Sequence, residues 1–202
     1  MHINFHFAVG LIFASILNII FNFNVLEFIL IVLFSFICDF DVFFNKYAKD
    51  HNHRLLITHS IIPSIVIIII GYIFLLPPLI LGGFSYSIHI FIDTLDWGTN
   101  FFYFQKKQVG FKFLISKEEI ENLPQYLAEY KLPASFFDEK YYSNKICLGM
   151  EVTFFVLMII FTVIFALEYF LMIFLYFVWL FFHLYRHFTL KKIEKNHKNT
   201  KF

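Results

Sequence analysis

Residues 38–60 read C-D-F-D-V-F-F-N-K-Y-A-K-D-H-N-H-R-L-L-I-T-H-S and interrupt a sequence dominated by isoleucine, leucine and phenylalanine. The stretch contains three aspartates, three histidines and one of only two arginines in the chain. Ionisable groups between hydrocarbon segments are costly, so they usually face a cavity and have a function. The stretch therefore divides an apolar chain and indicates a functional site at the division.

The composition is that of a membrane protein. Of the 202 residues, 59% are hydrophobic and only 15% are charged, whereas a soluble domain has about 45–50% apolar and about 25% charged residues. Because apolar runs near 18 residues indicate transmembrane helices, we predict an integral membrane protein. The formal net charge of +1 gives no electrostatic basis for direct nucleic-acid binding. The N-terminus lacks the pattern of a removable signal peptide.

Six apolar segments predict an all-α integral membrane protein of about six membrane helices packed as three hairpins. The first two segments are short for a span of about 20 residues, so whether the first hairpin crosses the bilayer stays open. The expected organisation is residues 1–98 for helices one to four with the site motifs, 99–145 for a polar loop with short helices, 146–190 for the last two membrane helices, and 191–202 for a basic tail. The segments are Phe5–Phe21, Val25–Cys38, Ile61–Leu75, Leu79–Leu95, Ile146–Ala166 and Phe170–Phe188.

Positive charge predicts the orientation. All 16 Lys and Arg residues lie on one side of these hairpins, with three in 39–58, seven in 98–145 and six from Arg186 onward. The positive-inside rule then places both termini and the reactive stretch at the cytoplasmic face of the cell membrane. We expect the tail to bind anionic lipid headgroups. In the polar loop, Ser116 and Glu119 predict a capping box that starts a helix.

The fourth apolar segment carries His89 and Asp93 at i, i+4, so the two side chains share one helix face. Asp96 extends that face. The pair can bind a metal directly, or the aspartate can orient the histidine. A hydrogen-bonded pair that joins two helices is an equally good reading of these residues alone.

Two more helix ends bring similar groups. Asp39 and Asp41 form a D-x-D motif, which can present two carboxylates to one cation or be a hydrated loop. His59 opens the third segment, and His6 lies near the start of the first, one turn after His2. A mixed set of histidines and carboxylates suits zinc, manganese or iron better than magnesium. The surplus of donors predicts two ions, or one ion whose ligands are held by further residues.

Other polar residues are less specific. Arg54 can stabilise an anionic substrate, and His53 beside it can be a ligand or an acid–base group. Glu151 can complete the metal site or act as a general base, or it can be an interfacial glutamate near Lys145. Asp50, His51, His183 and His187 are expected in loops or at the interface, and Cys38 and Cys147 are expected to pack, with Cys38 a weaker ligand candidate.

Four motifs follow one another along residues 2–98: H-F-A-V-G from His6, D-F-D from Asp39, H-R-L-L-I-T-H-S from His53, and S-I-H-I-F-I-D from Ser87. This order resembles the membrane-bound metal-dependent hydrolase family, which includes inner-membrane hydrolases described as LexA-binding. The block from His53 is one residue longer than the family's usual spacing, Leu55 replaces a small residue, and the prolines common near D-x-D are missing. The resemblance implies a metal-dependent hydrolase at the membrane surface and no particular substrate.

The prediction is therefore a hydrolase in which a metal-activated water attacks an ester or phosphoester, with a phospholipid-like substrate expected from the site's location. Zinc is the first choice of cofactor, with manganese or iron as alternatives. A non-catalytic metal-binding membrane protein, a metal-ion transporter and an inactive relative that serves in interactions remain alternatives. The expected metal ligands are His6, Asp39, Asp41, His59, His89 and Asp93, and the expected catalytic residues are Arg54, His53 and Glu151.

Overall fold

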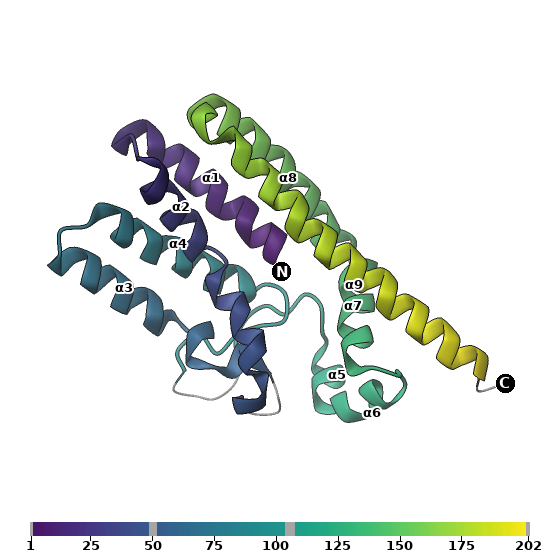
Figure 1. Ribbon diagram of the computed structural model, residues 1–202. Coiled ribbons are helices and arrows are strands. Elements are labelled where there is room, and N and C mark those ends of the chain that lie inside the picture. Colours follow the sequence, from purple (N-terminus) through teal and green to yellow (C-terminus); the bar gives the residue numbers. More distant parts are fainter. Residues whose placement is uncertain (1, 49–51, 104–107, 201–202) are drawn as a thin grey trace.

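The computed structural model describes residues 2–48, 52–103 and 108–200, and these ranges contain helices and no β-strand (Figure 1). The predicted all-α class is confirmed. Asp50, His51 and the last two residues of the basic tail lie outside the described residues. The α-helices are α1 (Ile3–Phe21), α2 (Val25–Phe34), α3 (Ile61–Ile73), α4 (Pro77–Asp93), α5 (Lys117–Glu121), α6 (Leu123–Ala128), α7 (Pro133–Ser143), α8 (Lys145–Phe165) and α9 (Ile173–Thr200), and the 3-10 helices are η1 (Ile37–Tyr47), η3 (His53–Leu55), η4 (Ile57–His59) and η5 (Leu167–Met172).

Three helices in the described ranges are long and apolar enough to cross a membrane. They are α1, α8 and the continuous helical stretch Leu167–His197 formed by η5 and α9. This agrees with a membrane protein. The expected second segment is divided, because α2 ends at Phe34 and the chain continues as η1, so α2 has only 10 residues. α3, with 13 residues, is also shorter than a full span.

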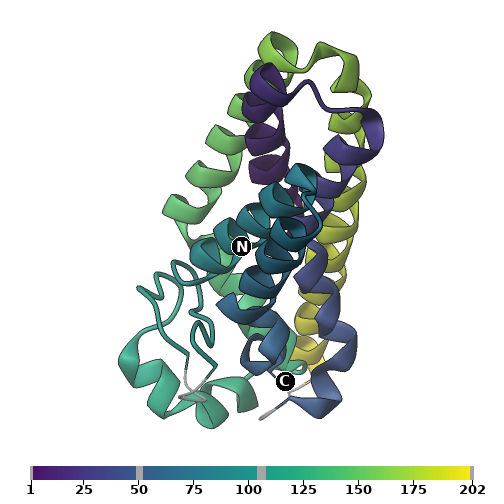
Figure 2. The same ribbon diagram turned by 90° about the vertical axis from the view of Figure 1, so that its left-hand side faces the viewer.

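The helices form a bundle that brings together helices from both ends of the chain. α3 packs on α4, α4 on α2, α2 on α1, and α1 on both α8 and α9 (Figures 1 and 2). α5, α6 and α7 lie at the lower end of the bundle in Figure 1, on the side where α1 begins. This arrangement brings the start of α1, the end of α4 and the 3-10 helices to the same end.

Local sequence signals set several helix boundaries. Asn24 caps α2 by accepting from the backbone N–H of Leu26 and Glu27, and the Glu27 carboxylate accepts from the Asn24 N–H. Ser116 and Glu119 form the predicted capping box at α5. The prolines at positions 77 and 78 begin α4, where a missing N–H costs little.

α1 lies very close to the end of α2 at Gly10. A Cβ built on Gly10 would lie 2.1 Å from the Oγ of Ser35 and 2.4 Å from its Cβ. Ser35 is the residue that ends α2, and its carbonyl accepts a hydrogen bond from His89 Nδ1 at 2.7 Å. The spacing of these two helices is therefore linked to the position of His89.

Replacing Gly10 with alanine is expected to force α1 and α2 apart and lower the melting temperature, because overpacking costs about 1–3 kcal/mol. The metal content after purification should fall as well, because a shift of the Ser35 carbonyl would move the His89 ring that is hydrogen-bonded to it. The matched control is Gly149→Ala in α8, where a Cβ meets nothing within 4 Å. Differential scanning fluorimetry in detergent measures both variants, and equal melting temperatures would contradict the contact.

Candidate metal centre

Four elements contribute to one buried cluster of histidines and aspartates. α1 supplies His6, η1 supplies Asp39, η4 supplies His59, and α4 supplies His89 and Asp93. The side chains of His6, His59, His89 and Asp93 are fully buried, and Asp39 keeps 15% of its side chain exposed. The sequence separations are large, so the cluster is a product of the tertiary fold.

Asp93 lies between the histidines. Its Oδ1 is 3.2 Å from His6 Nε2 and 3.2 Å from Arg54 Nη2. Its Oδ2 is 3.4 Å from His59 Nε2 and 3.3 Å from His89 Nε2. One carboxylate thus contacts three imidazoles and a guanidinium, all from different elements.

Asp39 faces the same imidazole nitrogens from the other side. Its Oδ1 is 3.5 Å from His89 Nε2 and 3.7 Å from His59 Nε2. Its Oδ2 is buried and has no hydrogen-bond partner among the described residues. Ligand atoms of His6, Asp39, His89 and Asp93 all lie within 4.8 Å of one another.

These donors fit a divalent cation. The buried Nε2 atoms of His6, His59 and His89 have no hydrogen-bond partner within the described ranges. Neighbouring ligands about 2.1 Å from a tetrahedral zinc are about 3.4 Å apart, and the nitrogen–oxygen distances from His59 and His89 to Asp93 are 3.4 and 3.3 Å. A cation bound between these three nitrogens and the neighbouring carboxylates would contact all of them.

The outer nitrogens of two of these histidines are held by other groups. His89 Nδ1 lies 2.7 Å from the Ser35 carbonyl, so it must donate. His59 Nδ1 lies 2.6 Å from Asp41 Oδ2, which also accepts from the Thr58 hydroxyl. Donation from Nδ1 leaves the Nε2 lone pair directed at the centre, which is how histidine ligands are usually fixed.

Asp41 and His53 form a neighbouring group with His59. One ligand atom from each lies within 4.8 Å of the others, and Cys38 makes a similar group with His59 and His89. Asp41 Oδ1 is buried without a hydrogen-bond partner in the described part of the chain. Asp41, His53 and His59 thus form a second group that could hold a cation. Binding there would replace the hydrogen bond between Asp41 and His59.

Burial, His59 and Arg54 together lower the pKa of His53 to about 4, so His53 is neutral near pH 7 and can accept a proton or bind a metal. Burial disfavours charge on His59 as well, but the carboxylates of Asp39, Asp41 and Asp93 around its ring outweigh burial and raise the pKa of His59 well above its usual value. The carboxylates therefore attract positive charge to the centre.

Arg54 is held beside the cluster by ion pairs with Asp96 and Asp93. Its Nη1 donates to Asp96 Oδ1 at 2.7 Å and its Nη2 to Asp96 Oδ2 at 3.1 Å, a bidentate pair. Nη2 also contacts Asp93, and Nη1 lies 3.3 Å from the Asp93 carbonyl. These contacts assign Arg54 the task of orienting Asp93; its expected contact with a substrate anion stays a prediction.

Changing Asp96 to asparagine is expected to destabilise the protein by about 3 kcal/mol, because breaking a buried ion pair leaves an uncompensated charge. Arg54 is 7% exposed and Asp96 is fully buried. The control is Glu119→Gln, which breaks the more exposed pair with Lys140 and should cost about 1 kcal/mol or less. Thermal denaturation in the same detergent compares the two, and similar losses would show that the Arg54 pair is not special.

Glu151 belongs to a different polar group. It accepts from the Tyr141 hydroxyl at 2.6 Å and from Asn4 Nδ2 at 3.4 Å. Beside it, His183 contacts His2 and the Tyr142 hydroxyl, and His187 pairs with Asp138 at 2.6 Å. Glu151 is absent from the described groups of donors that could hold a metal. The geometry thus gives it a role in joining α1, α7 and α8.

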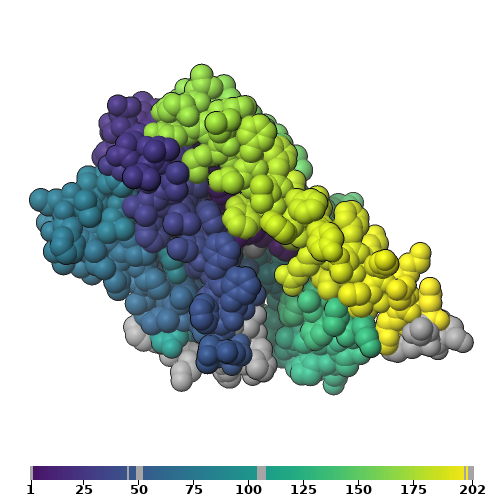
Figure 3. All heavy atoms as spheres, viewed as in Figure 1, coloured from purple at the N-terminus to yellow at the C-terminus, as the bar shows by residue number. Residues whose placement is uncertain are grey.

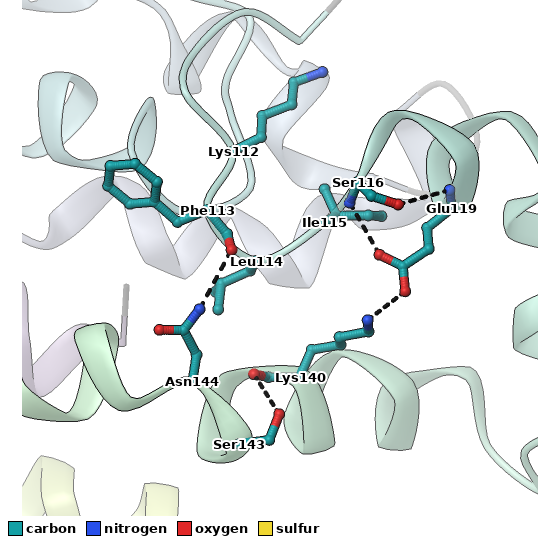
Figure 4. A pocket seen from close by; sticks show the side chains of 9 residues that line it. All are labelled: Lys112, Phe113, Leu114, Ile115, Ser116, Glu119, Lys140, Ser143 and Asn144. Atoms are coloured by element: carbon teal, nitrogen blue, oxygen red, sulfur yellow. Dashed lines mark hydrogen bonds and ion pairs between the residues drawn. The ribbon is translucent and has the colours of Figure 1, made fainter.

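A surface pocket of about 440 Å³ lies elsewhere, between residues 112–116, the start of α5 and the end of α7 (Figure 4). Figure 4 shows Lys140 paired with Glu119, and Asn144 donating to the Phe113 carbonyl. None of the candidate metal ligands lines it. The pocket therefore belongs to the packing of the loop and α5 on α7.

Comparison of the chain with protein-family models, curated proteins and solved structures finds no match. The grouping of His6, Asp39, His59, His89 and Asp93 therefore depends on the geometry of this chain. Sequence reasoning did not anticipate Ser35, whose contribution is a backbone carbonyl and leaves no mark in the sequence. Sequence reasoning named both Asp96 and Arg54 but did not predict that they form an ion pair.

Proposed function

We propose that the protein is a membrane-bound metal-dependent hydrolase whose centre holds a divalent cation, with zinc as the first choice. The observation that supports this most directly is the convergence of three buried imidazole nitrogens without hydrogen-bond partners on Asp39 and Asp93. Buried polar atoms normally have partners, so this group favours a bound cation. His6, His59, His89, Asp39 and Asp93 would hold it.

The bound cation would lower the pKa of a coordinated water to about 7 and polarise the scissile group. The chain's own residues supply the rest. Asp41 keeps the His59 ring oriented, Ser35 does the same for His89, and Arg54 holds Asp93. His53, neutral and partly exposed, is placed to accept or return a proton. The proposed substrate is an ester or phosphoester.

The membrane arrangement is proposed on the charge pattern. Six membrane helices paired as hairpins, with α2 to α4 as shorter members, would place the metal centre and both termini at the cytoplasmic face. In the structure, the candidate ligands lie at one end of the bundle. At the other end, the Asn18 amide donates to Glu168 at 2.6 Å and ties α1 to η5.

A metal-ion transporter is the main rival. A transport path should place ionisable groups near the middle of the membrane, often at broken helices. Between the two ends, a hydroxyl pair of Ser15 and Thr162, 3.5 Å apart, joins the described residues of α1 and α8. Hydroxyls alone are weak ligands for a divalent cation. The position of the histidines and aspartates at one end of the bundle therefore favours a site at one membrane surface over a transport path.

The proposal is tested by purifying the protein in detergent, measuring bound metals by elemental analysis, and assaying phosphoesters and carboxyl esters of increasing chain length. We expect about one or two equivalents of metal and turnover that a chelator abolishes. Bound metal without turnover on any ester would favour the non-catalytic alternative. Absence of bound metal after loading would overturn the proposal.

A further inference from the structure

The helix that carries Asp39 and Asp41 has an apolar outer surface. Asp41 is buried and Asp39 is largely so, whereas Phe43 is 75% exposed, Phe44 57% and Tyr47 70%. This pattern inverts that of a surface helix in water, whose polar residues face outward. The outer face of η1 is therefore suited to an apolar medium.

This face is continuous with helices that have the properties of membrane spans. The Phe40 ring lies 5.9 Å from Trp179 of α9 and stacks with Phe43 at 6.5 Å. Phe36, just before η1, also contacts Trp179, at 5.8 Å. In Figure 3 the surface of η1, in blue, continues that of α2 and borders α9. The medium that surrounds the exposed face of α9 near Trp179 therefore also contacts η1.

The end of η1 has the chemistry of a membrane interface. The ammonium of Lys46 lies 4.8 Å from the centre of the Tyr47 ring. Tyrosine and tryptophan gather at the level of the headgroups, and lysine there attracts phosphate. Tyr47 and Lys46, at the end of η1, thus mark a level at which hydrocarbon gives way to headgroups.

The metal centre is least covered next to this surface. Among its ligands, Asp39 alone keeps part of its side chain exposed, 15%, while the three histidines and Asp93 are fully buried. Phe40, the residue after Asp39, is 36% exposed. The ligand that keeps some exposure therefore lies on the same 3-10 helix as the exposed aromatic residues, next to a partly exposed phenylalanine.

We propose that η1 lies in the membrane interface with its aromatic face in the lipid, and that it presents the metal centre to the headgroup ester of a membrane lipid. The substrate part rests on the proposed function; the placement of η1 does not. The occupant of the face is the lipid surface, because the face joins that of α9 without a break. A second copy of the chain on the same face is the competing arrangement.

The placement is tested with a fluorophore attached to cysteine. Cys38 and Cys147 are buried, so NBD labelling of Phe43→Cys or Phe44→Cys in nanodiscs of phosphatidylcholine and phosphatidylglycerol reports those positions, with labelled wild type as background. We expect a blue-shifted emission and strong quenching by spin-labelled lipid. The control is Glu129→Cys, an exposed residue just after α6, which iodide in the buffer should quench instead. Quenching of positions 43 and 44 by iodide, as at 129, would overturn the proposal.

Two further measurements complete the test. If the label is shielded from both quenchers only when two copies share a nanodisc, a second chain covers η1 and the proposal fails. For the substrate, the double change Phe43→Ser with Phe44→Ser should lower turnover of a vesicle-borne phosphoester about tenfold relative to a soluble short-chain ester. Val152→Ser, which removes exposed apolar surface from α8, should leave that ratio unchanged. An unchanged ratio in the double variant overturns the lipid substrate, whereas absence of any turnover contradicts the proposed function and leaves the quenching result intact.

Discussion

Replacing His59 with alanine is expected to lower the metal affinity of the protein at least about 100-fold. Removal of a residue that only orients a ligand typically costs 10–100-fold, and in the proposed centre His59 is itself a ligand. Its Nε2 lies between Asp93 Oδ2 at 3.4 Å and Asp39 Oδ1 at 3.7 Å. Elemental analysis after loading with zinc and desalting measures the effect.

The matched control for this change is His187→Ala. His187 is also a histidine paired with a carboxylate, Asp138 at 2.6 Å, but it lies on α9 outside the cluster. The control variant should retain the metal content of the wild type. Loaded wild type should also gain about 2.7 kcal/mol of stability at a free zinc concentration of 100 times the Kd, and His59→Ala should lose that gain. If wild type and His59→Ala hold equally little metal under loading conditions, the metal hypothesis fails.

Much of the helical architecture could be predicted from local patterns. The long apolar run at 145–165, the prolines at 77 and 78 and the asparagines around 22–24 determine helix ends within a few residues, because caps and breakers act locally. The 3-10 helix η1 was predicted as a polar loop. Its aspartates suggested hydration, whereas in the fold they are largely buried and the phenylalanines that follow them, Phe43 and Phe44, are exposed.

The candidate ligands could be named from sequence, but their roles could not. Asp39 and Asp41 stand in one motif, yet Asp39 faces the inner nitrogens of two histidines while Asp41 holds the outer nitrogen of His59. That difference arises from the turn of η1 against η4, which depends on long-range packing. Glu151 illustrates the same limit: its distance from the cluster follows from the way α8 packs on α1.

The distribution of charge gives the centre its chemical character. Asp39 and Asp93 face three imidazoles, and Arg54 is bound on the far side by Asp96. With Arg54 neutralised by Asp96, the two inner carboxylates remain to balance a divalent cation. Transition-metal sites of mixed imidazole and carboxylate ligands have this composition. The deep burial of the histidines excludes bulk water, which strengthens each of these interactions.

Changing Asp39 to asparagine is expected to lower kcat/KM for ester hydrolysis by at least about 1,000-fold, or about 4 kcal/mol of transition-state stabilisation. Asparagine has nearly the same volume, so the fold should persist, but the change removes a negative charge beside the cation and turns an acceptor toward His89 Nε2, now 3.5 Å away, into a possible donor. Of the five proposed ligands, Asp39 is also the one whose side chain keeps some exposure, 15%. The control is Asp138→Asn, which removes the same charge from the His187 pair and should keep wild-type turnover. The measurement is the initial rate on the best ester, taken together with the metal content of the same samples. If Asp39→Asn keeps both its metal content and its turnover within tenfold of the wild type, Asp39 is not a ligand and Asp93 is the principal carboxylate of the centre.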